Sequence, residues 1–169
     1  MSGRYEEVVV GDITVLDVDV IVNAANPSLL GGGGIDGAIH RAAGEQLREH
    51  CRSLGGCDVG KAVLTPGFAL PAQWIIHTVG PKWRDGEHGE PEQLASCYIE
   101  CMKLADSVSA RSIAFPAISS GIFGYPAELA AATATSAVRT VGVSSVDIVK
   151  YVCFDAAMAA TVERALELL

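Results

Sequence analysis

The sequence contains no C-x-x-C pair, and its five cysteines are an odd number. Such a set does not fit a disulfide framework. Cys97 and Cys101 lie four residues apart in a segment with helical periodicity, so we expect two buried small side chains there. The spacing of His40, His50 and Cys51 matches no common zinc site. We therefore expect neither a metal nor a cofactor.

Long apolar runs are also absent. No segment is long enough to span a membrane, and the first residues, MSGRYEEVVV, lack the apolar core of a signal peptide. We therefore expect a cytoplasmic protein with no membrane partner.

Basic residues are scarce, since 12 Lys and Arg stand against 20 Asp and Glu and give a formal net charge of -8. An acidic surface opposes nonspecific binding to nucleic acid, because such binding relies on basic side chains that neutralise phosphates. We therefore expect no direct nucleic-acid binding. A ligand that carries phosphates would have to be held locally, by backbone amides and helix ends.

What the chain does have is apolar content and glycine. Half of its 169 residues are hydrophobic and 18 are glycine, which suits one compact domain over residues 1–169. Strand-like and helix-like segments alternate, and this alternation predicts a single three-layer α/β/α domain with a mixed, largely parallel sheet. The expected strands are residues 5–10, 18–22, 61–65, 74–79, 113–115 and 146–152, and the expected helices are residues 37–54, 92–108, 126–141 and 156–169.

Residues 23–43, NAANPSLLGGGGIDGAIHRAA, follow the second expected strand. Four successive glycines lose much conformational entropy on ordering, and they are useful where the main chain takes positive φ or comes close to a ligand. Their amides can face an anion, and Asp36 stands where the next helix begins, suited to capping its free N–H groups. An ordinary flexible loop before a capped helix is the alternative interpretation.

A dinucleotide-binding fold is not favoured, although Gly32, Gly34 and Gly37 satisfy the G-x-G-x-x-G expression. The eight residues Asn23 to Leu30 separate the strand from the run of glycines, whereas that fingerprint begins in the turn directly after the strand. A second glycine-containing loop, SSGIFGYP, follows residues 113–115, and Pro126 suits the first position of a helix. Ligands of parallel sheets bind beyond the carboxyl ends of the strands, so we expect both loops and residues 153–155 to meet there.

Four motifs in this order, NAAN, GGGGIDGAIHRAAG, LPAQWIIHTVGP and IAFPAISSGIFGYP, resemble the macrodomain family, most closely its MacroD-type branch. The resemblance covers essentially the whole chain. It implies an ADP-ribosyl ester hydrolase that removes mono-ADP-ribose from acidic side chains of proteins and deacetylates O-acetyl-ADP-ribose, by attack of water at the distal-ribose ester. Its implied partners are ADP-ribose, O-acetyl-ADP-ribose and mono-ADP-ribosylated proteins.

The resemblance also implies a role for individual residues. Asp12 would recognise the adenine amino group beside the Ile13 amide, and Phe154 would pack on the adenine. The first phosphate-binding loop would be lined by Gly32, Gly33 and Gly34, and the second by Ser119, Ser120, Gly121, Ile122, Phe123 and Gly124, with Phe123 orienting the distal ribose. The positions linked to catalysis in this branch are matched by Asn23, Asn26, Asp36 and His40.

The residues alone support these roles unequally. Asn26 offers a donor and an acceptor that suit a ribose hydroxyl. Turn geometry ahead of Pro27 is the alternative for Asn23 and Asn26, and for Asn23 it fits as well as direct contact. His40 lies one helical turn after Asp36, so we expect it to support Asp36 rather than to transfer a proton, and a buried histidine with satisfied hydrogen bonds is the alternative interpretation. Asp36 itself would hold or activate the attacking water.

The sequence also gives expectations for the rings of Phe123 and His77, and it leaves two other functions open. Phe123 on its glycine loop is expected to be exposed or to face a ligand, and His77 within a strand is expected to be structural. A non-catalytic ADP-ribose reader or an ADP-ribose phosphatase would share the fold and the adenine and phosphate contacts. The set Asn26, Asp36 and His40 is what favours a hydrolase.

Overall fold

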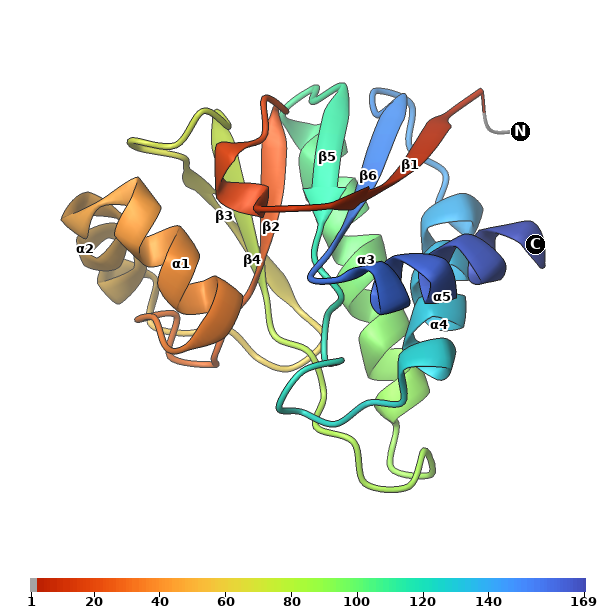
Figure 1. Cartoon of the computed structure of the whole chain (residues 1–169). Coiled ribbons are helices and arrows are strands. Elements are labelled where there is room, and N and C mark those ends of the chain that lie inside the picture. The colour runs from red at the N-terminus through yellow and green to blue at the C-terminus, as the bar shows by residue number, and fades with distance from the viewer. Residues whose placement is uncertain (1–2) are drawn as a thin grey trace.

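The computed structural model describes residues 3–169, and a six-stranded sheet forms its centre (Figure 1). The strand order is β1-β6-β5-β2-β4-β3, and every neighbouring pair is parallel except β3 and β4, which are antiparallel. The mixed, largely parallel sheet expected from the sequence is therefore confirmed. The strands are β1 (Tyr5–Val10), β2 (Val20–Ala24), β3 (Ala62–Pro66), β4 (Trp74–Thr78), β5 (Ser112–Phe115) and β6 (Ile148–Cys153).

Helices cover both faces of the sheet, which confirms the three-layer arrangement. One apolar core joins the sheet to α3, α4 and α5. A second core joins the opposite face to α1, α2 and the 3-10 turn η1, and Figure 1 shows the two groups of helices on opposite sides. The helical elements are η1 (Ile13–Val15), α1 (Gly34–Ala43), α2 (Glu45–Leu54), α3 (Glu90–Ser107), α4 (Ala127–Thr140) and α5 (Ala156–Glu167).

Strand β2 shows how the pleat sorts side chains between the two cores. Val20 and Val22 belong to the core of α3, α4 and α5, whereas Ile21 between them belongs to the core of α1 and α2. Successive side chains of a strand point to opposite faces, so Asn23 must share the face of Ile21. The apolar run thus delivers a polar side chain to the layer that contains α1.

The single helix expected over residues 37–54 is wrong, because the segment forms two helices that meet at Gly44. This glycine has a φ of 95°, a conformation that L side chains rarely adopt, and its N–H donates to His40 O at 3.1 Å. The expected stop after α2 is confirmed, since Gly55 has a φ of 75°. A helical spacing of apolar residues continued across this break and concealed it.

Helix α1 begins at Gly34, three residues before the expected start, and the boundaries of the other elements differ from expectation by no more than two residues. Two of these shifts matter. Strand β2 continues to Ala24, so Asn23 is a strand residue and the turn interpretation of Asn23 is wrong. Pro126 is the residue before α4, not its first residue.

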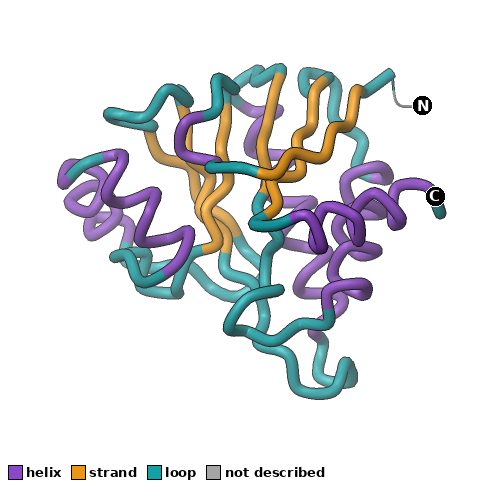
Figure 2. Tube along the Cα trace, in the orientation of Figure 1, coloured by secondary structure: helices purple, strands orange, loops and turns teal. Residues whose placement is uncertain are grey.

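Figure 2 shows the loops that follow β2, β4 and β5 gathered along the lower edge of the sheet. The expected burial of Cys97 and Cys101 is confirmed, and both are free thiols. None of the helices in residues 3–169 is long and apolar enough to cross a bilayer.

Candidate functional site

The candidate site lies at the edge of the sheet where the parallel strands end. The glycine loop, residues 25–33, follows β2, and the second loop, residues 116–126, follows β5. These two strands are parallel neighbours, with Val20 opposite Ile113. Both loops therefore leave the same edge from adjacent positions, as expected for a parallel sheet.

The glycine loop lies directly on the start of α1. Asn26 is exposed and its Nδ2 donates to Gly31 O at 3.2 Å. A Cβ added at Gly32 would come within 2.6 Å of Asn26 Nδ2 and 3.2 Å of Asp36 Oδ2, so both polar groups lie against the Gly32 main chain. A Cβ at Gly37 would overlap the Gly32 carbonyl oxygen, which explains why a glycine stands in this turn of the helix.

Asp36 is buried, with 4% of its surface exposed. Its Oδ1 accepts a hydrogen bond from Asn23 Nδ2 at 2.9 Å, and its Oδ2 has no partner. The expectation that Asp36 caps the helix is wrong, because Gly33 occupies the cap position and no side chain caps the N–H groups there. The carboxylate is instead hydrogen-bonded to the side-chain amide of Asn23 in β2.

His40 lies one turn further along α1, as its spacing predicted. Its Nε2 is 3.5 Å from Asp36 Oδ1, an approach that does not meet hydrogen-bond geometry, and neither ring nitrogen has a partner. The ring packs against Gly31, which has a φ of 96°. A Cβ added at Gly31 would lie 3.5 Å from His40 Cγ. His40 therefore contacts both the glycine loop and the Asp36 carboxylate.

The second loop contains two neighbouring serines in different surroundings. Ser119 is buried, has a φ of 65°, and donates from Oγ to Pro81 O at 2.8 Å. Ser120 Oγ is buried without a partner and borders a cavity of about 20 Å³, the size of one water molecule. Gly121 and Gly124 are exposed, and the Gly124 N–H donates to Gly121 O at 3.0 Å.

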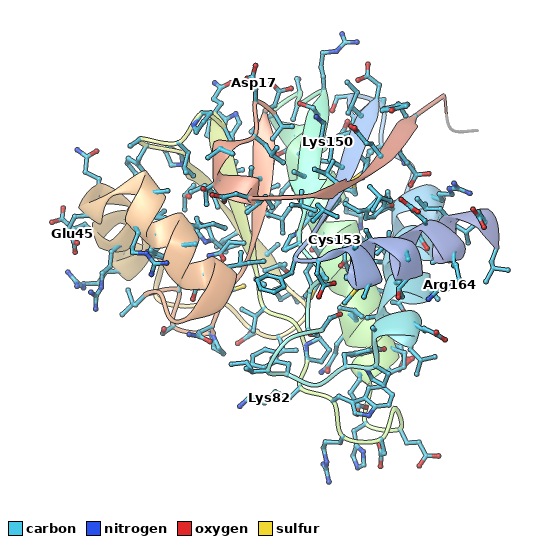
Figure 3. All side chains as sticks on the ribbon, in the orientation of Figure 1. Asp17, Glu45, Lys82, Lys150, Cys153 and Arg164 are labelled. Atoms are coloured by element: carbon cyan, nitrogen blue, oxygen red, sulfur yellow. The ribbon has the colours of Figure 1, made fainter. Side chains whose placement is uncertain are left out.

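The side chains of this loop point outward to different degrees. Ile122 is fully exposed, whereas Phe123 is partly buried. Lys82 Nζ lies 5.6 Å from the centre of the Phe123 ring, and the Trp83 N–H donates to Phe123 O at 2.9 Å. Figure 3 shows Lys82 at the lower edge, among the loops. The loop between β4 and α3 therefore contacts Phe123 through Lys82 and Trp83.

The buried carboxylate of Glu90 stabilises the loop between β4 and α3. Glu90, only 2% exposed, accepts hydrogen bonds from the N–H groups of Arg84, Asp85, Gly86 and His88. Burial alone would raise the pKa of Glu90, but these backbone hydrogen bonds outweigh it and lower the pKa. The only sequence signal for this role was Pro91, which fits the first turn of a helix and so places Glu90 at its start.

Glu90 also belongs to the one trio in residues 3–169 whose ligand atoms lie close enough to share a metal ion, with Asp85 and His88. Both Glu90 oxygens already accept N–H groups, and His88 Nδ1 already contacts Asp85 Oδ1 at 2.8 Å. These contacts account for the trio as a loop anchor. The donor set therefore does not indicate a metal centre.

The residues assigned to adenine lie at the far end of the same edge. Val10 and Cys153 pair at the ends of β1 and β6, and the Gly11 N–H donates to Cys153 O at 3.2 Å. Asp12 is the second residue after β1 and Phe154 is the first residue after β6, so this contact brings the two close together. Figure 3 shows Cys153 where β6 turns into α5.

The two side chains differ in how firmly they are held. Asp12 Oδ1 accepts from Thr14 Oγ1 at 2.7 Å and from Thr14 N at 2.9 Å, and these hydrogen bonds lower the pKa of Asp12. Phe154 is 92% exposed. Ile13 is buried in the core of α1 and α2, so its side chain is not available to a ligand.

The structure thus joins some of the expected site residues and separates others. Asn23, Asp36 and His40 are in contact, and Asn26 meets them through Gly32. Within residues 3–169, no hydrogen bond links residues 31–34 to residues 119–124. A ligand that uses both loops would have to bridge them.

Comparisons with known proteins agree with this arrangement. Residues 22–134 match the Macro domain family. A Macro domain-containing protein of Chlorobaculum tepidum is 64% identical over 128 residues, which cover 76% of this chain and 74% of the relative. Another from Ralstonia nicotianae is 56% identical over 155 residues, covering 92% of this chain and 90% of the relative.

Solved structures are similar over nearly the whole chain. A mutant of the Oceanobacillus iheyensis macrodomain with ADPR has a TM-score of 0.90 at 40% identity and covers 95% of this chain and 91% of that one. The Trypanosoma brucei macrodomain in complex with ADP-ribose has a TM-score of 0.88 at 39% identity and covers 96% of this chain and 69% of that one.

Proposed function

This chain belongs to the Macro domain family, and from that premise we propose that it is an ADP-ribosyl ester hydrolase. It binds ADP-ribose, removes mono-ADP-ribose from acidic side chains of proteins and deacetylates O-acetyl-ADP-ribose. Structures of relatives that contain ADPR or ADP-ribose support the ligand. The surroundings of Asp36 support the reaction.

The diphosphate would be held by main chain. Gly32, Gly33 and Gly34 are exposed at the N-terminus of α1, where free N–H groups and the helix dipole favour an anion. The second loop adds the unpartnered Ser120 hydroxyl and the exposed backbone of Gly121. Asp12 and Phe154 would receive the adenine, and Phe123 the distal ribose.

The single observation that carries the catalytic proposal is the Asp36 carboxylate. It is buried, one oxygen is fixed by Asn23, and the other oxygen has no partner although it lies against the glycine loop. A buried carboxylate oxygen without a hydrogen-bond donor costs stability. Because Asp36 Oδ2 has no donor within the described protein, it is suited to accept a hydrogen bond from a donor that arrives with the ligand. A water molecule is such a donor.

The reaction then follows from this geometry. Asp36 Oδ2 accepts a proton of the water, whose oxygen adds to the ester carbonyl carbon at the distal ribose. The bond between that carbon and the ribose oxygen breaks, the acyl group leaves as a carboxylic acid, and the proton passes to the ribose oxygen. Asn26 holds a ribose hydroxyl, and the loop amides keep the diphosphate in place while charge develops.

The experiment is turnover of a protein mono-ADP-ribosylated on glutamate by the variants Asp36→Asn and Asn26→Ala. Loss of a positioned base reduces the rate by about 100-fold or more, so Asp36→Asn should release ADP-ribose at that reduced rate while still binding free ADP-ribose. Binding and circular dichroism report that the site and fold persist.

Asp17→Asn is the matched control, because it makes the same chemical change at an exposed carboxylate. Figure 3 shows Asp17 at the opposite edge of the sheet from the loops. It should hydrolyse at the normal rate. Undiminished release by a folded Asp36→Asn protein would refute the assignment.

A reader module that binds ADP-ribose without hydrolysing it is the second candidate, because the exposed glycine amides serve binding whether or not chemistry follows. Single-turnover reactions separate the two. With enzyme in excess over the modified protein, a hydrolase releases all accessible ADP-ribose, whereas a reader retains the modified protein and releases none.

A further inference from the structure

Four buried polar side chains form a line beneath the glycine loop. Thr65 of β3 contacts His77 Nε2 at 3.0 Å, and His77 Nδ1 contacts Asn23 Nδ2 of β2 at 3.1 Å. Asn23 Nδ2 in turn donates to Asp36 Oδ1 at 2.9 Å. Exposure is 1% for Thr65, 0% for His77 and Asn23, and 4% for Asp36. The line therefore runs from the edge strand of the sheet to the carboxylate of the proposed reaction.

Strand periodicity explains why these residues meet. Asn23 and His77 are directly opposite each other in the parallel pair β2 and β4, two residues after Ile21 and Ile75. Those two isoleucines pack against α1 and α2, so their polar successors point to the same layer. Thr65 pairs with Ile75 across the antiparallel β3 and β4 and lies on this face as well.

The direction of each hydrogen bond is fixed by its neighbours. Asn23 Nδ2 has two hydrogens, and one goes to Asp36 Oδ1 while the other faces His77 Nδ1. Nδ1 must therefore be the acceptor, which places the imidazole hydrogen on Nε2. Nε2–H then donates to Thr65 Oγ1, and the Thr65 hydroxyl donates to Pro66 O at 3.1 Å.

The opposite arrangement would break the line. A hydrogen on His77 Nδ1 would face an N–H of Asn23, and turning the Asn23 amide around would place its oxygen against Asp36 Oδ1. Two acceptors at that distance repel each other. Burial lowers the pKa of His77 to about 3, so the ring is neutral at neutral pH and one nitrogen must stay an acceptor.

We propose that Thr65 and His77 are positioning residues, which select the amide orientation of Asn23 and thereby hold the Asp36 carboxylate under Gly32. This inference rests on the proposed function. Neither residue touches the glycine loop or transfers a proton; the effect reaches the ester through Asn23 and Asp36. With both Asn23 hydrogens committed, Asn23 Oδ1 and Asp36 Oδ2 remain as buried acceptors without a partner among the described residues.

The first test compares His77→Asn with His77→Leu. The two side chains have the same shape, and both lose the contact with Thr65, but only asparagine offers an oxygen where His77 Nδ1 accepted from Asn23. Because a misplaced catalytic group costs much of its rate, His77→Leu should lower kcat by about tenfold or more, whereas His77→Asn should stay within about threefold of the natural protein. The Kd for ADP-ribose should change by less than about twofold in both, since the loops keep their contacts. Equal kcat values for the two variants would overturn the proposal.

The second test compares Thr65→Ser with Thr65→Val and uses the His77 ring as the reporter. Long-range proton–nitrogen NMR spectra distinguish protonated from unprotonated ring nitrogens. The natural protein and Thr65→Ser should carry the hydrogen on Nε2, and Thr65→Val should populate the other tautomer with a parallel loss of kcat. A hydrogen on Nδ1 in the natural protein would overturn the proposal.

These outcomes test the positioning role of Thr65 and His77 separately from the hydrolase function on which it rests. If the natural protein bound ADP-ribose and released none from any substrate, the hydrolase proposal would fail, and the NMR result would still decide whether Thr65 and His77 set the amide of Asn23. If the natural protein hydrolysed the ester and His77→Leu had the same kcat, only the positioning role of Thr65 and His77 would be refuted.

Discussion

Ser119 and Ser120 show how much two adjacent, identical side chains can differ. The hydroxyl of Ser119 holds the second loop to Pro81, whereas that of Ser120 is buried without a partner. The resemblance to macrodomains assigned both to phosphate binding, and the sequence offers no way to separate them. Ser119 also has a φ of 65°, a backbone conformation that its residue type does not predict.

The serine pair gives the first prediction. Ser119→Ala should lower the free energy of unfolding by about 1 to 3 kcal/mol, because the buried Pro81 carbonyl loses its donor. Ser120→Ala should change it by less than about 0.5 kcal/mol, since no hydrogen bond within the protein is lost. If Ser120 binds a phosphate, its variant should instead weaken ADP-ribose binding by about tenfold, the effect of one hydrogen bond to a charged group. Urea unfolding and calorimetric titration measure the two quantities, and the reverse pattern would contradict both assignments.

His77 gives the second prediction, on acid stability. Burial first, and then the nearby His40 and His50, lower the pKa of His77 to about 3, below its ordinary 6.5. Between these values the unfolded chain binds a proton that the folded protein excludes, so acidification favours unfolding. From pH 7 to pH 5 this residue alone should remove about 2 kcal/mol of stability.

The matched variant for that measurement is His77→Asn, which has no proton to take up. Its free energy of unfolding should fall less between pH 7 and pH 5 than that of the natural protein, as measured by urea unfolding at each pH. Equal losses would mean that other groups account for the acid sensitivity.

At the scale of elements, the glycine loop and the start of α1 form one unit. The sequence predicted the loop and its exposed glycines but not the order of the contacts, because the capping role expected for Asp36 depends on local geometry whereas its actual partner, Asn23, comes from another strand. The break at Gly44 was missed for the opposite reason: the apolar spacing continued through it, and only the φ of 95° reveals it. Local patterns predicted the elements, and contacts between elements decided the site.

The two central glycines of the loop give the third prediction. A methyl group at Gly32 would displace the Asn26 amide and crowd Asp36, whereas a methyl group at Gly33 meets nothing within 4 Å. Gly32→Ala should therefore reduce hydrolysis by about 100-fold, the cost of moving reacting groups by about 1 Å, and reduce stability by about 1 kcal/mol.

Gly33→Ala is the matched change one residue later, and it should leave the free energy of unfolding unaltered. Its effect on kcat should be much smaller than that of Gly32→Ala. Thermal unfolding and steady-state hydrolysis measured on both proteins decide this, and equal damage from the two methyl groups would show that contact with Asn26 is not what requires Gly32.

At the scale of the whole molecule, charge gives the fourth prediction. The chain carries a formal net charge of -8, and the diphosphate is proposed to bind main-chain amides. Raising NaCl from 50 to 500 mM should change the ADP-ribose Kd by less than about threefold and should, if anything, tighten binding, because salt screens the repulsion between the acidic protein and the anion. A steep loss of affinity with salt would instead indicate that lysines or arginines hold the phosphates. Calorimetric titration at several salt concentrations is the measurement.

The order of strands was beyond prediction from the sequence. Alternating segments predicted a mainly parallel sheet, but nothing in the run EEVVV of β1 indicates that it pairs with β6, or that β3 runs antiparallel to β4. Pairing of this kind depends on how distant segments pack, and these segments have similar apolar composition.

The pairing of β1 with β6 has a consequence for synthesis on the ribosome. Of the six strands, β1 is made first, yet β6, beside which it lies in the finished sheet, is made last. A valine-rich segment with free backbone groups must therefore wait, unpaired, while the remainder of the protein is made, and such segments are prone to adhere to other chains. The sheet can close at this edge only after β6 has left the exit tunnel.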